Sequence, residues 1–263
     1  MSTPSELLDL ATRIAVSAGE LAARRRAEGV TVAASKSSLE DVVTEADRET
    51  EALIRSLIAE ARPDDGFLGE EGGAEQGTSG LTWVVDPIDG TVNYLYGIPQ
   101  YAVCVAVVEG GVDPLHWTAL AGAVHNPAIG ELYSASRGAG AWLGARPIRV
   151  ADAVPLERAL VATGFGYDAE VRRRQGAIAA ALLPRVRDIR RIGTASLDLA
   201  YVADGRLDAY YERGLNPWDQ AAGAIIAQEA GAVVKGLGDA RADHELLIAG
   251  HPDLVGPLEE LLL

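Results

Sequence analysis

The segment WVVDPIDGT (residues 83–91) joins an apolar run to two carboxylates and a turn. Its first three residues predict the end of a buried strand, and its proline, glycine and threonine are turn formers. Asp86 and Asp89, three residues apart at a rigid strand end, can converge on one point, and the carbonyl of Ile88 can face the same way. Oxygen atoms in this arrangement suit a hard cation. An ordinary turn explains the same residues, and both interpretations stay open at this point.

Two further acidic segments lie before and after this one. The sequence GEEGG (residues 69–73) follows a second predicted strand, and NPWDQAAG (residues 216–223) places Asp219 in the first turn of a helix. Each also has a simpler explanation. The first can be a solvated acidic loop, and the second can stabilise the helix dipole, which is worth a few tenths to about 1 kcal/mol.

The three segments together carry four carboxylates, those of Glu70, Asp86, Asp89 and Asp219. If the fold brings these side chains into one pocket, they indicate a functional site. Carboxylates about 4 Å apart repel by about 4 kcal/mol per pair at an effective dielectric constant of about 20. Four such groups cannot all stay ionised in one cleft without a bound divalent metal. Mg²⁺ is the natural choice because it takes oxygen ligands and typically partners substrate phosphates.

The composition is that of an acidic globular protein of 263 residues. The chain has 23 basic and 38 acidic side chains, which gives a formal charge of −15. Such a charge repels nucleic acid and anionic lipid, so we expect no direct nucleic-acid or membrane partner, although acidic surfaces also serve solubility. The single Cys104 excludes an internal disulfide framework and a cysteine-based zinc site. The start of the chain lacks the basic segment of a signal or transit peptide, and the apolar runs are too short to span a bilayer. We therefore expect a cytoplasmic protein.

The hydrophobic pattern divides the chain into two halves. Helical spacing and capping residues predict helices at 3–28 and 45–61, separated by a polar loop, and strands over much of the rest of the first half. In the second half strands alternate with helices, which are predicted near 168–183, 196–204, 217–230 and from 252 onward. We assign residues 1–151 to an N-terminal α+β half with the metal and phosphate motifs. Residues 152–263 form a C-terminal α/β half with the substrate-binding residues.

Taken in order, these motifs resemble the inositol monophosphatase family, in the lithium-sensitive, Mg-dependent phosphatase superfamily. The resemblance runs from Lys36 to Gly231 and rests on DPIDGT followed by VNYLYGIP, on NPWDQAAGAIIAQEAGA, and on the spacing from GEE to DPIDGT. It implies a layered α-β fold, a five-layer α-β-α-β-α sandwich of the inositol monophosphatase/fructose-1,6-bisphosphatase type. The site would lie between the two halves. A homodimer is implied as well, and the strand at 102–108, apolar on both faces, could be part of the interface or of the core.

The resemblance also implies a metal site of two to three Mg²⁺ ions. Glu70, Asp86 and the carbonyl of Ile88 would hold one ion, and Asp86, Asp89 and Asp219 the second. A third, weaker ion would rely on Glu70. The implied chemistry is in-line attack on phosphorus by a metal-activated water. Lithium would inhibit at the second position.

Phosphate binding and water activation are assigned by the same resemblance. The backbone amides of Gly90 and Thr91 begin a helix and would bind the phosphate. The Thr91 hydroxyl would pair with Asp47 to orient and deprotonate the water, with Glu70 as its other contact. The simpler alternative makes Asp47 the partner of a Thr44 helix cap and Thr91 a cap residue.

Two residues of the loop between the first helices match family positions. Lys36, one of only two lysines in the chain, would lie near the metal cluster and offset its charge, although a solvated loop lysine explains it equally well. Asp41 occupies a matching position and is interpreted as structural.

Substrate choice is assigned to the second half. The positions that match those lining the polyol in inositol monophosphatases, together with two metal-site acids, form the substrate-binding set Asp89, Gly193, Thr194, Ala195, Glu212 and Asp219. Glu212 and Asp89 would accept hydrogen bonds from ring hydroxyls. An acid in this place repels highly anionic substrates, which weighs against a nucleotide bisphosphate or a sugar bisphosphate. The favoured substrate is an inositol monophosphate, a small phosphate monoester.

Two alternatives stay open. Histidinol-phosphate phosphatases of the same family use the same metal cluster, and Glu212 could serve their cationic amine equally well. A second class of function is a non-catalytic protein-binding regulator of transcription or ribosome biogenesis, since some bacterial relatives of this family work with RNA polymerase or the ribosome. The four histidines show no ligand spacing and are interpreted as structural or surface residues.

Overall fold

The computed structural model describes residues 2–30, 32–35 and 42–263. Lys36 and Asp41 lie outside the described residues. The two helices that the sequence predicts at 3–28 and 45–61 are α1 (Pro4–Glu28) and α2 (Glu45–Ala61), and they pack side by side. Each begins with a capping box, formed by Thr3 with Glu6 in α1 and by Thr44 with Asp47 in α2. In such a box the threonine side chain and the acid three residues later satisfy each other's free backbone N–H groups.

The larger sheet has eight strands in the order β10-β9-β8-β7-β6-β5-β3-β4. All neighbours are antiparallel except β3 and β5, which run parallel. The strands are β3 (Gly66–Gly69), β4 (Gly73–Glu75), β5 (Leu81–Asp89), β6 (Ala102–Glu109), β7 (Thr118–Asn126), β8 (Glu131–Ser136), β9 (Ala141–Leu143) and β10 (Arg146–Ile148).

The smaller sheet has five strands in the order β12-β11-β13-β15-β14. Its strands are β11 (Leu160–Thr163), β12 (Asp188–Arg190), β13 (Ala209–Glu212), β14 (Val233–Lys235) and β15 (Leu247–Gly250). Its helices are α4 (Ala169–Leu182), α5 (Ala195–Ala203), α6 (Pro217–Glu229) and α7 (Pro252–Glu259), and the 3-10 turns are η1 (Leu156–Arg158) and η2 (Leu183–Arg185). The division at residue 151 falls between the last strand of one sheet and the first strand of the other, and stays a prediction.

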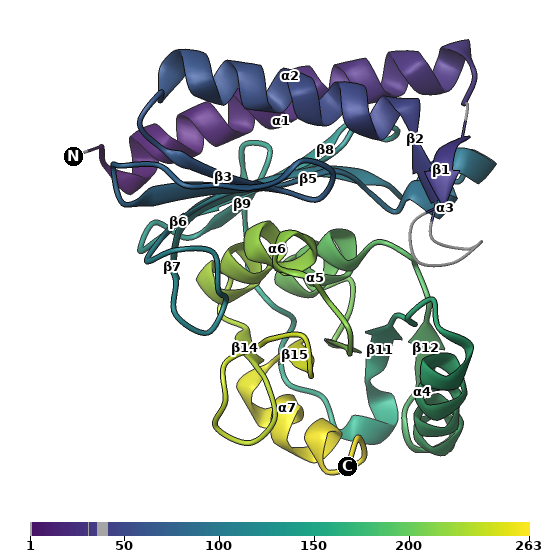
Figure 1. The fold of residues 1–263 in the computed structure, drawn as a ribbon. Helices are drawn as coiled ribbons and strands as arrows, with labels where there is room; N and C mark the ends of the chain where they lie inside the picture. The colour runs from purple at the N-terminus through teal and green to yellow at the C-terminus, as the bar shows by residue number, and fades with distance from the viewer. Residues whose placement is uncertain (1, 31, 36–41) are drawn as a thin grey trace.

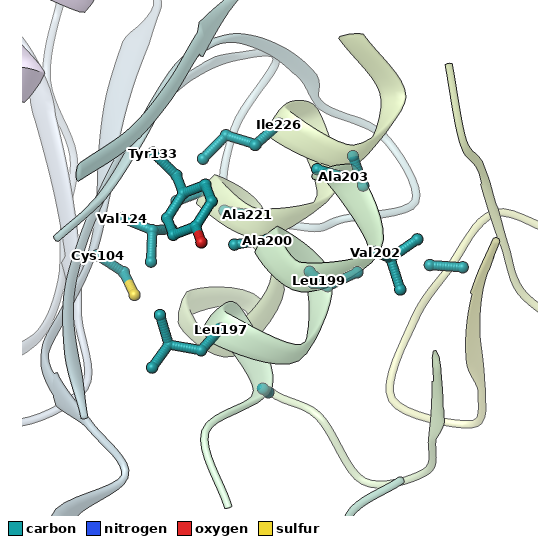
Figure 2. Packing of buried hydrophobic residues seen from close by; sticks show 14 of the residues in the cluster. Cys104, Val124, Tyr133, Leu197, Leu199, Ala200, Val202, Ala203, Ala221 and Ile226 are labelled. Carbon is teal, nitrogen blue, oxygen red and sulfur yellow. The ribbon is translucent and has the colours of Figure 1, made fainter. Parts of the chain in front are cut away.

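Five layers follow one another from α1 and α2 through the larger sheet, α5 and α6, and the smaller sheet to α4 and α7 (Figure 1). The middle layer is the most apolar one. Leu197 of α5 and Ile226 of α6 face Cys104, Val124 and Tyr133 of the larger sheet (Figure 2). This arrangement confirms the predicted layered sandwich. None of the described helices is both long and apolar enough to cross a membrane.

Strand β6, which the sequence predicted as apolar on both faces, lies in the interior of the larger sheet. It contacts α1 on one side and α5 and α6 on the other, and its residues 102–108 are all buried. The chain therefore covers both faces of this strand by itself. Its apolar pattern gives no support to the predicted homodimer, which now rests on the resemblance alone.

The structure adds strands that the sequence pattern did not predict. A two-stranded ribbon of β1 (Val32–Ser35) and β2 (Val42–Thr44) stands within the segment predicted as a polar loop, and β4 adds an edge to the larger sheet. These strands have three or four residues each. So short a segment shows too few alternations for a period of two to be recognised.

Candidate active site

The end of β5, directly before α3 (Thr91–Tyr96), carries the two aspartates of the DPIDGT segment. The β5–β6 pairing is irregular between Asp86 and Asp89, which are 2% and 8% exposed. Gly90 follows in the left-handed region at φ 88°, where a Cβ atom would lie 2.5 Å from the Thr194 hydroxyl. Only glycine satisfies both the backbone angle and the close approach. The carboxylates are therefore held at a fixed bend between sheet and helix.

Asp89 is held by the start of α5. Its Oδ2 accepts hydrogen bonds from the backbone N–H of Ser196 at 2.7 Å and from the Ser196 hydroxyl at 2.5 Å. A carboxylate at a helix N-terminus satisfies free N–H groups and gains from the helix dipole. The sequence analysis missed Ser196, because the only signal was a serine in the first turn of a predicted helix. Nothing in the sequence says that its partner lies 107 residues away.

Asp219 lies in the first turn of α6, where its Oδ2 accepts a hydrogen bond from the backbone N–H of Asn216 at 2.6 Å. The simpler explanation offered by the sequence, helix capping, is thus present. The same carboxylate also lines the cleft that contains Asp86 and Asp89. Capping fixes this side chain at the cleft wall and uses one of its two oxygen atoms.

A single cleft of about 1360 Å³ collects most of the predicted site residues. Its wall includes the four carboxylates, the β5–α3 turn and the predicted polyol positions, namely Glu70, Asp86, Ile88, Asp89, Gly90, Thr91, Gly193, Thr194, Ala195, Glu212 and Asp219. Asp47 is not part of this wall. Segments more than a hundred residues apart in the sequence thus meet at one site.

The electrostatics of the cleft are those of a cation site. Burial, followed by the charges of Glu70, Asp89 and Asp219, raises the pKa of Asp86 well above its ordinary value. The pKa of Asp219 is raised in the same way, by burial and then by Asp89 and Glu70. Burial also raises the pKa of Asp89 to about 6, against the hydrogen bonds from Ser196.

Burial and the neighbouring carboxylates make ionisation of these acids unfavourable, and a bound cation stabilises their charged form. An all-oxygen donor set fits a hard divalent ion. Within the described part of the chain, no three acidic, histidine or cysteine side chains are already gathered around one point as metal ligands. The carboxylates line a common wall.

Thr91 connects Asp47 to the cleft. The Thr91 hydroxyl lies 3.1 Å from Oδ1 of Asp47 and 3.0 Å from the carbonyl oxygen of Ile88, and its one proton can serve either acceptor. The other oxygen of Asp47 accepts from the backbone N–H of Thr44 at 2.8 Å and from the Thr44 hydroxyl. Asp47 is 1% exposed, and burial raises its pKa to about 6 against the Thr44 bonds. The capping role and the contact with Thr91 are therefore both present.

The polyol side of the cleft is built around Glu212, at the end of β13. Its Oε2 accepts a hydrogen bond from the Tyr210 hydroxyl at 2.6 Å. The carboxylate lies so close to Gly164 that a Cβ atom there would be 1.9 Å from Oε2. Burial raises the pKa of Glu212 to about 7, and the Tyr210 bond and the Arg191 charge oppose this rise.

The segment before α5 is fixed by a residue that the sequence analysis missed, Asn93. Its side-chain amide donates to the carbonyl of Gln100 at 2.7 Å and to that of Ile192 at 2.9 Å, and so ties α3 to the second half of the chain. The Thr194 hydroxyl also donates to Gln100, at 2.7 Å. The Thr194 hydroxyl is therefore engaged in a hydrogen bond within the protein, although Thr194 lines the cleft.

Comparison with known proteins places these features in a family. A family model described as "Inositol monophosphatase family" matches residues 3–252. The chain is 45% identical over 249 residues to the Inositol-1-monophosphatase SuhB of Mycobacterium tuberculosis, which covers 88% of this chain and 84% of that protein. It is 40% identical over 252 residues to the Nus factor SuhB of Pseudomonas aeruginosa, with 93% and 89% covered.

The fold agrees with a solved structure. The crystal structure of the extragenic suppressor protein suhB from Bartonella henselae superposes with a TM-score of 0.90 at 35% identity, over 98% of each chain. Sequence, fold and the placement of the carboxylates thus lead to the same conclusion. The chain belongs to the inositol monophosphatase family.

Proposed function

We propose that this protein is a magnesium-dependent phosphatase that hydrolyses phosphate monoesters of small polyols, with inositol monophosphate as the favoured substrate. One observation carries the proposal. A buried carboxylate cluster, a glycine-threonine turn and an acid on the polyol side line the same cleft, although they come from distant parts of the sequence. Such a constellation suits metal-assisted phosphate chemistry.

The metal ligands in this proposal are Glu70, Asp86, the carbonyl of Ile88, Asp89 and Asp219, which would hold two to three Mg²⁺ ions. Bound there, divalent ions supply positive charge to the phosphate and increase the acidity of a water molecule. The chain contributes by keeping these oxygen atoms buried and oriented. The hydrogen bonds from Ser196 to Asp89 and from Asn216 to Asp219 hold two of the carboxylates in place.

Thr91 and Asp47 would move the proton of the attacking water. With the Thr91 hydroxyl donating to Asp47, as the 3.1 Å contact allows, the threonine oxygen is free to accept a hydrogen bond from water. As the water attacks phosphorus, its proton passes to Thr91 and the threonine proton passes to Asp47. A pKa of about 6 suits Asp47 to a base near neutral pH. The amides of Gly90 and Thr91 would bind the phosphate at the start of α3.

Glu212 would accept hydrogen bonds from ring hydroxyls of the leaving group. The neighbouring Arg191, whose charge opposes the rise in the Glu212 pKa, also lines the cleft. A cation in this place repels the amine of histidinol phosphate. The structure therefore favours a neutral polyol over that alternative.

The test is phosphate release with Mg²⁺ from myo-inositol 1-phosphate and from histidinol phosphate. We expect faster release from the inositol ester, and a KM raised roughly tenfold by Glu212→Gln, since a hydrogen bond to a charged group is worth about 1.5–3 kcal/mol. Preference for histidinol phosphate would contradict the substrate assignment. Release from neither would favour the protein-binding alternative; a relative from Pseudomonas aeruginosa is named Nus factor SuhB.

A further inference from the structure

The proposed metal ligand Glu70 lies in a hairpin turn at the edge of the larger sheet. Gly69 of β3 pairs with Gly73 of β4, so residues 70–72 form the turn that joins the two strands. Strand β4 is the outermost strand on this side of the sheet, and all of its residues are exposed. A turn at an exposed edge moves more easily than the middle of a sheet or helix. A ligand carried there needs other parts of the protein to hold the turn.

Helix α2 places a buried carboxylate against this turn. Glu51 is 4% exposed, and its Oε2 accepts a hydrogen bond from the backbone N–H of Glu71 at 2.8 Å. That N–H belongs to the planar peptide group that follows Glu70, so the bond fixes the orientation of this plane. The direction in which the Glu70 side chain leaves the backbone is thereby set from α2.

The two glycines that flank the acids make room for the same carboxylate. A Cβ atom on Gly72 would lie 2.5 Å from Oε1 of Glu51, and a Cβ atom on Gly69 would collide with Oε2. The turn therefore closes around the Glu51 carboxylate. The sequence allowed GEEGG to be a solvated acidic loop, but Glu70 and Glu71 are half-buried, and the glycines permit a close approach to α2.

Arg55, one helical turn after Glu51, connects α2 to both strands of the hairpin. Its Nη2 lies 3.8 Å from Oε1 of Glu51, and its Nη1 donates to Oε2 of Glu75 in β4 at 2.9 Å. Its Cζ lies 4.0 Å from the centre of the Phe67 ring in β3, within the range of a cation–π interaction. One side chain thus contacts β3, β4 and the acid that holds the turn between them.

A carboxylate at this place in α2 is a poor choice for stability alone. Burial of a charged group is unfavourable unless hydrogen bonds and an opposite charge compensate for it. Further along α2, Ile54 and Ile58 are buried in the core beneath the helix. An apolar side chain in place of Glu51 would pack as these do, but it would offer no acceptor to the N–H of the turn.

We propose that Glu51 is a positioning residue for the metal site. Its carboxylate, supported by Arg55, holds the β3–β4 turn so that Glu70 lines the cleft. The inference deepens the proposed function and rests on it, because Glu70 binds a divalent ion only if the carboxylate cluster is a metal site. Replacing a residue that orients a metal ligand typically lowers metal affinity or activity by about 10–100-fold.

Two substitutions separate the hydrogen bond of Glu51 from its charge. Glu51→Gln keeps the length of the side chain and an acceptor oxygen but loses the charge, whereas Glu51→Asp keeps the charge and is one methylene too short. The readout is the binding of Mn²⁺, which takes the same oxygen ligands as Mg²⁺ and is counted in its free form by electron paramagnetic resonance. We expect Glu51→Asp to raise the Kd for Mn²⁺ by about tenfold or more, and Glu51→Gln to change it by less than about threefold.

Hydrogen exchange supplies a second readout that needs no metal. In the metal-free protein, the backbone amide of Glu71 should exchange about tenfold faster in Glu51→Asp than in the wild type, and at nearly the wild-type rate in Glu51→Gln. Ile58→Val, about two helical turns beyond Glu51, is the matched control. It weakens the packing of the same helix and should leave the Kd for Mn²⁺ unchanged.

Three results would overturn the positioning role: a wild-type Kd in Glu51→Asp, equal losses in Glu51→Asp and Glu51→Gln, or a loss in Ile58→Val as large as that in Glu51→Asp. If Glu51→Asp does not fold, Arg55→Gln replaces it. That variant should raise the Kd for Mn²⁺ by about threefold or more, and an unchanged value would overturn the role. A wild type that binds no Mn²⁺ and releases no phosphate would instead overturn the proposed function.

Discussion

Ser196 acts on the site through Asp89. It donates both its backbone N–H and its hydroxyl to one carboxylate oxygen, which leaves the remaining oxygen of Asp89 for a ligand. Ser196→Ala removes the 2.5 Å bond and keeps the backbone bond. We expect kcat to fall roughly tenfold and the free energy of unfolding to fall by about 1–2 kcal/mol, as for a lost hydrogen bond to a charged group.

The measurements for Ser196→Ala are steady-state phosphate release and thermal unfolding. Ser196→Thr keeps the hydroxyl and should recover most of the activity. Full activity in the alanine variant would show that the backbone bond alone orients Asp89.

At the residue scale, the sequence predicted what lies close together in the chain. Asp86 and Asp89 lie three residues apart at the end of β5, so the sequence could predict that both line one site. The sequence did not predict Ser196, Asn93 and Arg191. Their partners, or the cleft that they line, lie close to them only in the folded chain. A single serine, asparagine or arginine has no local pattern that distinguishes it from an ordinary surface residue.

At the scale of elements, the two capping boxes offer a direct comparison. Thr44 caps α2 and also holds the aspartate that contacts Thr91, whereas Thr3 caps α1 far from the cleft. Loss of either cap costs about 1 kcal/mol of stability, within a range of about 0.5–2 kcal/mol. Only the loss of Thr44 frees Asp47 to turn away from Thr91.

We therefore expect Thr44→Ala and Thr3→Ala to lower the free energy of unfolding by similar amounts, but only Thr44→Ala to lower kcat, by at least tenfold. Denaturant unfolding and phosphate release measure the two effects. Equal activity in both variants would mean that Asp47 serves the helix alone.

Elements with strong local signals were predicted well. Helices α1, α2 and α6 carry caps and apolar residues at helical spacing, and each begins at the residue range expected from them. The ribbon of β1 and β2 was missed because its pairing, and not its composition, makes it a strand. The layered order of the elements was implied by the resemblance and could not be derived from periodicity.

At the scale of the whole molecule, the buried acids make stability depend on pH. The pKa values of Asp47 and Asp89 are raised from the ordinary 3.8 to about 6 in the folded protein. Between these values the folded protein binds more protons than the unfolded chain, so stability falls as pH rises.

We expect the metal-free protein to melt at a lower temperature at pH 7.5 than at pH 5, and Mg²⁺ at pH 7.5 to restore much of the loss. Thermal unfolding with and without a chelator measures this. Asp89→Asn removes one titrating group and should show a weaker dependence on pH and on Mg²⁺. A metal-free protein that is more stable at pH 7.5 would contradict the assignment of these acids.

The predicted homodimer is also a property of the whole molecule. Light scattering coupled to size exclusion should give a mass of twice 27.6 kDa. A mass near that of one chain would overturn the prediction.

The central claim is that the carboxylate cluster supports hydrolysis of a polyol phosphate. Phosphate release from myo-inositol 1-phosphate, with and without Mg²⁺, in the wild type and in Asp89→Asn, tests it most directly. The account predicts Mg²⁺-dependent release by the wild type and a loss of at least a hundredfold in Asp89→Asn, whose amide keeps the shape but not the charge of the side chain. Undiminished release by a folded Asp89→Asn, or release by the wild type that is indifferent to Mg²⁺, would contradict it.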